Sequence, residues 1–162
     1  MKILLTLPIF ILLPQPLAAD VIPVKPFAQG IIRLPQYPFG KTHKSKPKPS
    51  PLIVVRNAKE YARFLDRIPK KQISKTRPVP LNTDPLLKRP RISFQKHTLL
   101  VLTRPSMTQP KFTKVTGNSK SLDVTAEFPR ELPAARPIHI GTYTAVLIPQ
   151  SSLPIRLKTT QP

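Results

Sequence analysis

The sequence contains no cysteine and no tryptophan, and it has only 4 glycines and 7 acidic residues. Without cysteine the chain can form neither disulfides nor thiolate metal sites. So few carboxylates leave little material for a paired acid/base site, and no glycine-rich segment resembles a phosphate-binding loop. The three histidines, His43, His97 and His139, lie far apart and lack carboxylate neighbours. We therefore expect no metal site and no cofactor.

Proline and basic residues are abundant. The 162 residues include 23 prolines, and 27 Lys and Arg give a formal net charge of +20. Many prolines with few glycines favour stiff, extended connections. A strongly basic balance is typical of partners such as nucleic acid, a membrane surface or an acidic polymer. The alternative is a solvated basic surface with no dedicated partner.

The amino terminus resembles a secretory signal peptide. Lys2 precedes an apolar run over residues 3–13, and a proline break and small residues lead to Ala19. A basic start, a run of about eleven apolar residues and a small-residue end are the three parts of such a signal. The run is shorter than the roughly 20 residues of a transmembrane helix, although an uncleaved anchor stays an alternative. We expect residues 1–19 to be removed, giving an exported protein, periplasmic or extracellular, that binds no nucleic acid and has no stable transmembrane anchor.

Composition divides the remaining chain into three parts. Residues 20–51 are rich in proline and lysine and are interpreted as a partly disordered linker, although Phe27 and Ile32 would allow its first part to pack as an arm. Residues 52–158 carry the periodic patterns of an α+β domain, and residues 159–162 form a tail. One folded domain is expected.

The central element is expected over residues 91–105. Ile92 and Phe94 alternate with polar residues, and a continuous apolar run, Leu99 to Leu102, follows them. Such a run is typical of a strand buried on both faces. Since Ser93 and Lys96 would point to opposite faces of this strand, their Ser-x-x-Lys spacing does not predict a nucleophile and base, and we expect no enzymatic activity.

One helix is expected after a short strand at residues 52–55. Asn57 is a suitable N-cap, and Glu60 three residues later completes a capping box. Apolar residues from Tyr61 to Ile68 recur at helical spacing, and Pro69 ends the helix. Residues 70–90 are interpreted as a long basic loop with one turn near residues 83–87.

The second half predicts further strands. A hairpin is expected from residues 111–116 and 121–128 around Gly117 and Asn118, followed by an inner strand at residues 142–148. Alternation from Leu153 to Leu157 predicts a last strand at an edge. The predicted fold class is therefore α+β, with a small antiparallel sheet of about five to six strands and one helix packed on it.

These segments have the order of a known family pattern. Ile92–Phe94, the aliphatic run after it, the hairpin region 112–128 and the strand Tyr143–Pro149 together resemble the C-terminal domain family of the protease complex subunit PrcB. The family's glycine-containing segment after the central strand is replaced here by residues 105–112, which contain no glycine. The resemblance implies a secreted, non-enzymatic module that binds or assists another cell-envelope protein.

The remaining candidate site is a positive patch on the polar face of the helix and on the loop after it. Its predicted residues are Arg56, Lys59, Arg63, Arg67, Lys70, Lys71, Lys75, Arg77, Lys88, Arg89 and Arg91. In the cell envelope the leading partner class is a protein. The alternative is an anionic envelope polymer, that is, a lipid surface or a glycan bound electrostatically.

Overall fold

The computed structural model describes residues 20–35, 50–72, 78–129 and 139–160. Within these ranges the chain forms eight strands, one α-helix and one short 3₁₀ helix. In chain order they are β1 (Asp20–Val21), β2 (Lys25–Arg33), β3 (Leu52–Val55), α1 (Ala58–Leu65), η1 (Pro85–Lys88), β4 (His97–Arg104), β5 (Lys111–Gly117), β6 (Leu122–Glu127), β7 (Ile140–Pro149) and β8 (Ile155–Thr160). The predicted signal peptide lies outside the described residues.

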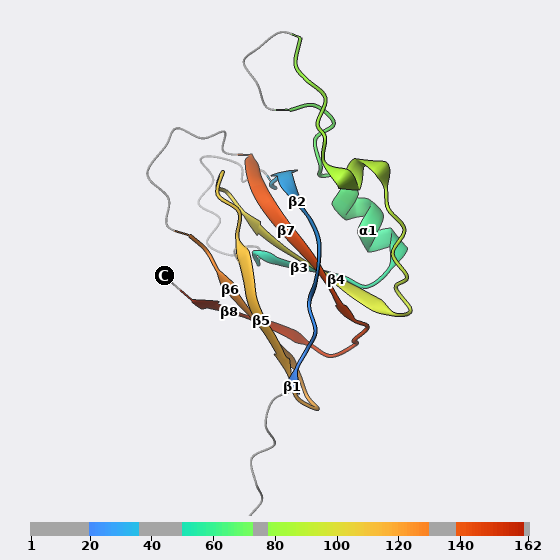
Figure 1. Ribbon diagram of the computed structural model, residues 1–162, viewed down its shortest axis with the longest axis vertical. Helices are drawn as coiled ribbons and strands as arrows, with labels where there is room; N and C mark the ends of the chain where they lie inside the picture. The colour runs from blue at the N-terminus through green and yellow to red at the C-terminus, as the bar shows by residue number, and fades with distance from the viewer. Residues whose placement is uncertain (1–19, 36–49, 73–77, 130–138, 161–162) are drawn as a thin grey trace, which may run out of the picture.

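The strands form two sheets of four. One sheet has the order β2-β7-β4-β3 and is antiparallel throughout, and the other has the order β1-β5-β6-β8. Figure 1 shows α1 on one side of the β2-β7-β4-β3 sheet and the second sheet on the other. The α+β class is confirmed. The expected single sheet of five to six strands is wrong, because the strands divide between two stacked sheets.

The β2-β7-β4-β3 sheet is the middle layer and is buried on both faces. In β4, Leu99 and Val101 pack with the helix, whereas Leu100 and Leu102 pack with the second sheet. All four side chains are fully buried. This alternation follows from the period of two along a strand, and it confirms the expectation that residues 99–102 are buried on both faces.

The central strand begins later than the sequence pattern predicted. β4 starts at His97, and residues 94–96 form a turn in which the carbonyl of Ser93 accepts hydrogen bonds from the amides of Lys96 and His97. Phe94 is half-buried and meets the ring of Tyr61 edge-on, with ring centroids 5.9 Å apart. The aromatic residue therefore packs beside the helix from a turn instead of from a strand face.

Helix α1 begins as its capping residues predicted. The amide of Glu60 donates to the side-chain oxygen of Asn57 at 2.9 Å, and the Glu60 carboxylate accepts from the amide of Arg56 at 2.7 Å. The first contact satisfies a backbone donor that a helix start leaves without a partner, and the second ties the helix to the residue before its cap. Tyr61, Phe64 and the following leucine are buried against the middle sheet.

The amino-terminal segment is part of the fold, in place of the linker expected over residues 20–51. β1 pairs with β5 in the second sheet, and β2 pairs with β7 over eight residue pairs in the middle sheet. Ile32 is fully buried beside α1. The arm left open by the sequence is thus an edge strand of each sheet, whereas residues 36–49 lie outside the described ranges.

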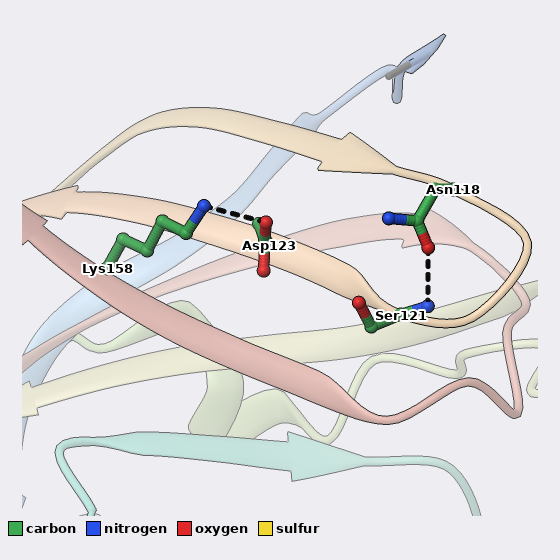
Figure 2. A network of polar contacts seen from close by, with 4 residues as sticks. All are labelled: Asn118, Ser121, Asp123 and Lys158. Carbon is green, nitrogen blue, oxygen red and sulfur yellow. Dashed lines mark hydrogen bonds and ion pairs between the residues drawn. The ribbon is translucent and has the colours of Figure 1, made fainter. Parts of the chain in front are cut away.

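The second sheet is built on the predicted hairpin. β5 and β6 pair antiparallel, and the Asn118 side chain accepts from the amide of Ser121 at the turn (Figure 2). β8 lies beside β6 at the edge of the sheet but runs parallel to it, which the sequence did not predict. Lys158 on β8 contacts the Asp123 carboxylate on β6 at 2.8 Å, as Figure 2 shows, and so links these two strands.

Candidate functional site

A basic groove of about 790 Å³ lies at the carboxyl end of α1. This volume is within the range of small-molecule and peptide pockets, roughly 300–1,000 Å³. The groove is formed by residues from the helix end, from η1 and from the ends of β2 and β7. They are Arg33, Leu65, Asp66, Ile68, Pro69, Lys70, Lys71, Gln72, Leu86, Leu87, Arg89, His139 and Ile140.

The groove combines positive charge with apolar surface. Arg33, Lys70, Lys71 and Arg89 supply four cationic side chains, all on exposed residues, against the single carboxylate of Asp66. Arg89 and Asp66 approach to 3.8 Å with both side chains 70% exposed. Solvent screens such a pair strongly, so it contributes little to stability. Most of the positive charge therefore stays available to an anionic ligand.

Backbone pairing holds the lysine pair of the groove in place. The amide of Asn82 donates to the carbonyl of Lys70 at 3.0 Å, and the amide of Gln72 donates to the carbonyl of Pro80 at 2.9 Å. Lys71 forms an isolated antiparallel bridge with Leu81. The expected long loop therefore contains ordered backbone pairing around Lys70 and Lys71, and its predicted turn is confirmed as η1.

A second set of contacts fixes the helix end to β2. The amide of Arg33 donates to the carbonyl of Arg67 at 2.8 Å, and the Nε of Arg67 donates back to the carbonyl of Arg33 at 3.1 Å. Arg67 is half-buried, and this burial lowers the pKa of its guanidinium. Arg67 therefore holds the wall of the groove together and is not a free member of a binding patch.

A buried carboxylate lies close to the groove wall. Asp84 accepts hydrogen bonds from the hydroxyl of Tyr143, at 2.8 and 2.7 Å to its two oxygens, and from the amide of Leu86 at 2.9 Å. Asp84 caps η1, and Leu86 at the centre of η1 is buried and lines the groove. A Cβ on Gly30 would lie 2.1 Å from Asp84, so only glycine fits on β2 at this point.

This carboxylate changes the ionisation of two neighbouring tyrosines. Burial, the hydrogen bond to Asp84 and its negative charge together raise the pKa of Tyr143 far above its ordinary value. Burial, and then the charge of Asp84, raise the pKa of Tyr61, whose hydroxyl donates to the carbonyl of Pro90. Both phenols therefore remain neutral hydrogen-bond donors at any physiological pH.

Arg89 enters the groove from a strained backbone position. It follows η1 with a φ of 50°, in the left-handed region, and its amide donates to the carbonyl of Leu86. A residue with a Cβ is disfavoured there by roughly 1–2 kcal/mol. Glycine would suit this turn better. The structure thus holds a cationic side chain where the backbone alone favours glycine.

The structure brings together only part of the predicted basic patch. Three of its residues, Lys70, Lys71 and Arg89, line the groove. Arg67 braces the groove wall, and Arg56 donates to the carbonyls of Ser151 and Leu153 near the start of α1. The patch residues that are exposed but do not line the groove are Lys59, Arg63, Lys88 and Arg91. Lys75 and Arg77 lie outside the described residues.

Two basic residues of the groove, Arg33 and His139, were not predicted as part of the site. Arg33 falls in the segment interpreted as a linker, and His139 was assigned to a connecting loop. They reach the groove because β2 and β7 pair with Arg33 opposite Ile140. Pairing between strands more than 100 residues apart leaves no local signal. The start of η1, in contrast, has a local signal in the sequence, because Asp84 followed by Pro85 is a frequent helix start.

A second hollow of about 730 Å³ lies between β2, β7 and the segment before β5. It opens on the face of the middle sheet that meets the second sheet. Its lining is mainly apolar and includes Val24, Pro26, Phe27, Pro110, Phe112 and Val146. The sequence analysis predicted no site in this hollow.

Comparison with family models, curated proteins and solved structures gave no match. The resemblance to the PrcB family therefore stays a proposal. In the described ranges no three potential metal ligands come together, and none of the helices there is long and apolar enough to cross a membrane.

Proposed function

We propose that this chain is an exported, non-catalytic domain that binds another cell-envelope protein through the basic groove. The observation that supports this is the combination of four cationic side chains with an apolar floor in one groove. The signal-like amino terminus and the resemblance to a secreted binding module favour export. An acidic protein segment is the partner that this chemistry suits.

The floor of the groove favours a protein over a purely anionic polymer. Apolar side chains line the groove together with the cations, and two of them, Leu87 and Ile140, are partly exposed. A lipid headgroup layer or a glycan has little apolar surface to place there, whereas a peptide can present acidic and apolar side chains together. Burial of apolar area contributes affinity that salt does not screen.

Charge removal inside and outside the groove tests this proposal. We expect the double variant Lys70→Ala/Lys71→Ala to bind a fluorescent glutamate- and leucine-containing peptide about three- to tenfold more weakly at low salt. The matched control is Lys59→Ala/Arg63→Ala, which removes the same charge from exposed helix positions that do not line the groove. Fluorescence anisotropy over a salt series measures both.

Each alternative has its own outcome. Equal weakening by both double variants would mean that the positive field as a whole attracts the peptide, and the groove would not be the site. A second outcome is that the domain binds anionic phospholipid vesicles or an acidic polysaccharide but not the peptide. That result would mean that the partner is an anionic polymer and not a protein. Binding of the peptide that is retained in part at high salt would support the apolar floor.

A further inference from the structure

The outer edge of β2 carries backbone groups that no described residue pairs with. The amide of Leu34 donates to the carbonyl of His139, which sets the register between β2 and β7. In an antiparallel ladder, alternate residues direct their N–H and C=O groups toward the neighbouring strand and away from it. Counting back from Leu34, the groups of Arg33, Ile31 and Gln29 therefore point away from β7.

The contacts of Arg33 confirm this direction. Its amide and carbonyl are bonded to Arg67 at the end of α1, on the side opposite β7. Among the described residues, no hydrogen bond involves the outward N–H and C=O groups of Gln29 and Ile31. Two amides and two carbonyls, those of Gln29 and Ile31, therefore face outward. Gln29 is exposed, so this sheet edge is accessible.

Two other edge strands are less suited to pairing. β3 is only four residues long, and β8 follows Pro154 and carries the exposed Arg156 and Lys158. Short strands, prolines and charged side chains are features that protect sheet edges. β2 is nine residues long, and its proline and charged residues, Lys25, Pro26 and Arg33, lie at its two ends, so residues 27–32 carry none of these features. β2 ends the middle sheet (Figure 1).

The two hollows lie on opposite faces of the middle sheet, and β2 borders both. The basic groove is on the α1 side and includes Arg33 at the end of β2. The apolar hollow includes Val24, Phe112 and Val146, which pack with the second sheet, and also Gln29 on β2. Side chains of an added strand would alternate between these two faces, because their period is two.

We propose that the edge of β2 at Gln29 and Ile31 accepts an extended segment of the partner as an added strand. The segment has acidic side chains on the face toward the basic groove and apolar side chains on the face toward the apolar hollow. Main-chain hydrogen bonds to the sheet edge supply affinity, and the two hollows supply specificity, as in other strand-addition complexes. This inference rests on the proposed function, since it names the form and the side-chain pattern of the protein segment that the domain binds.

The test compares two peptides of identical composition and charge. One alternates glutamate and valine, and the other has its glutamates in one block and its valines in another. Only the alternating peptide can place acidic and apolar side chains on opposite faces of a strand. We expect it to bind the full mature chain about tenfold more tightly than the block peptide, in line with one or two backbone hydrogen bonds.

A proline variant tests the role of the edge directly. Gln29→Pro removes the outward amide but leaves the bonds between β2 and β7 intact, because Gln29 does not bond to β7. We expect Gln29→Pro to bind the alternating peptide about three- to tenfold more weakly than Gln29→Ala, which loses the same side chain but retains the amide. Thermal unfolding of both variants checks that the fold is kept.

Amide hydrogen exchange gives a measurement that needs no variant. In the free protein the amides of Gln29 and Ile31 should exchange faster than those of Gly30 and Ile32, which face β7. Saturation with the alternating peptide should slow exchange at Gln29 and Ile31. Binding of both peptides with equal affinity and no such protection would overturn strand addition and leave the groove as an electrostatic site. No binding of either peptide would overturn the proposed function as well.

Discussion

Asp84 shows how one carboxylate can organise the helix side of the molecule. It is 7% exposed, it accepts from the hydroxyl of Tyr143 and from the amide of Leu86, and it requires glycine at position 30. A buried ionised group is costly unless it is hydrogen-bonded. The contacts of Asp84 therefore link η1 to β7 and keep the adjoining wall of the basic groove in register.

Loss of the Tyr143 hydroxyl should be costly. Tyr143→Phe leaves the ring in its edge-on contact with Phe64, at 5.4 Å between centroids, but removes a donor to a buried carboxylate. We expect the free energy of unfolding at neutral pH to fall by about 1–3 kcal/mol. Urea unfolding of the wild type and the variant measures this difference.

The free energies of unfolding of the wild type and of Tyr143→Phe should also depend differently on pH. Because the pKa of Tyr143 is raised in the folded state, the unfolded chain releases this proton first, at about pH 10. The unfolded state then binds fewer protons, and the stability of the wild type falls as pH rises above about 10. The Tyr143→Phe variant has no phenol to titrate at this position, so the stability gap between the two proteins should narrow there. A gap that is constant with pH would contradict the burial and bonding of Tyr143.

At the scale of elements, local signals predicted the type of each element better than its limits. The Asn57 cap predicted the start of α1, and the hairpin turn at Asn118 was confirmed. The pattern before His97 was misleading, because Ile92 and Phe94 have the spacing of a strand but pack beside the helix from outside β4. Alternation of apolar residues reports a buried face and does not by itself report the backbone conformation.

This difference changes the expected cost of a core substitution. On a buried strand face, as the alternating pattern indicated, Phe94→Ala would cost about 3–5 kcal/mol. A half-buried ring with one edge-on contact to Tyr61 should cost less, about 1–3 kcal/mol. Leu100→Ala, at a fully buried position in β4, should cost about 2–5 kcal/mol. Chemical denaturation of both variants checks the order, and a larger effect at Phe94 would contradict it.

At the scale of the whole molecule, the chain has three layers, and its amino-terminal segment belongs to two of them. β1 ends the second sheet and β2 ends the middle sheet. The predicted cleavage after Ala19 falls directly before β1, so a mature chain that begins at Asp20 would contain both strands. The same segment supplies Arg33 to the basic groove and the strand edge, at Gln29 and Ile31, that is proposed to receive a partner strand.

Removal of this segment should destabilise the entire domain. A chain that begins at Ser50 lacks the fully buried Ile32 and exposes the edge of β7. We expect its melting temperature to lie at least about 10 °C below that of a chain beginning at Asp20, because several kcal/mol of packing are lost. Circular dichroism with heating compares the two chains. Equal melting temperatures would mean that β1 and β2 are dispensable and that the linker interpretation describes the solution state.

The sequence by itself determined the α+β class, the capped helix, the hairpin and the burial of residues 99–102 on both faces, because caps, turns and apolar periods act between residues close in the chain. Only the tertiary structure decided that the strands divide into two sheets, that β8 runs parallel to β6, and that Arg33 joins Lys70 and Arg89 in one groove. These features depend on pairing and packing between distant segments. The free energy of such contacts comes from area that two segments bury together, and neither segment carries that information alone.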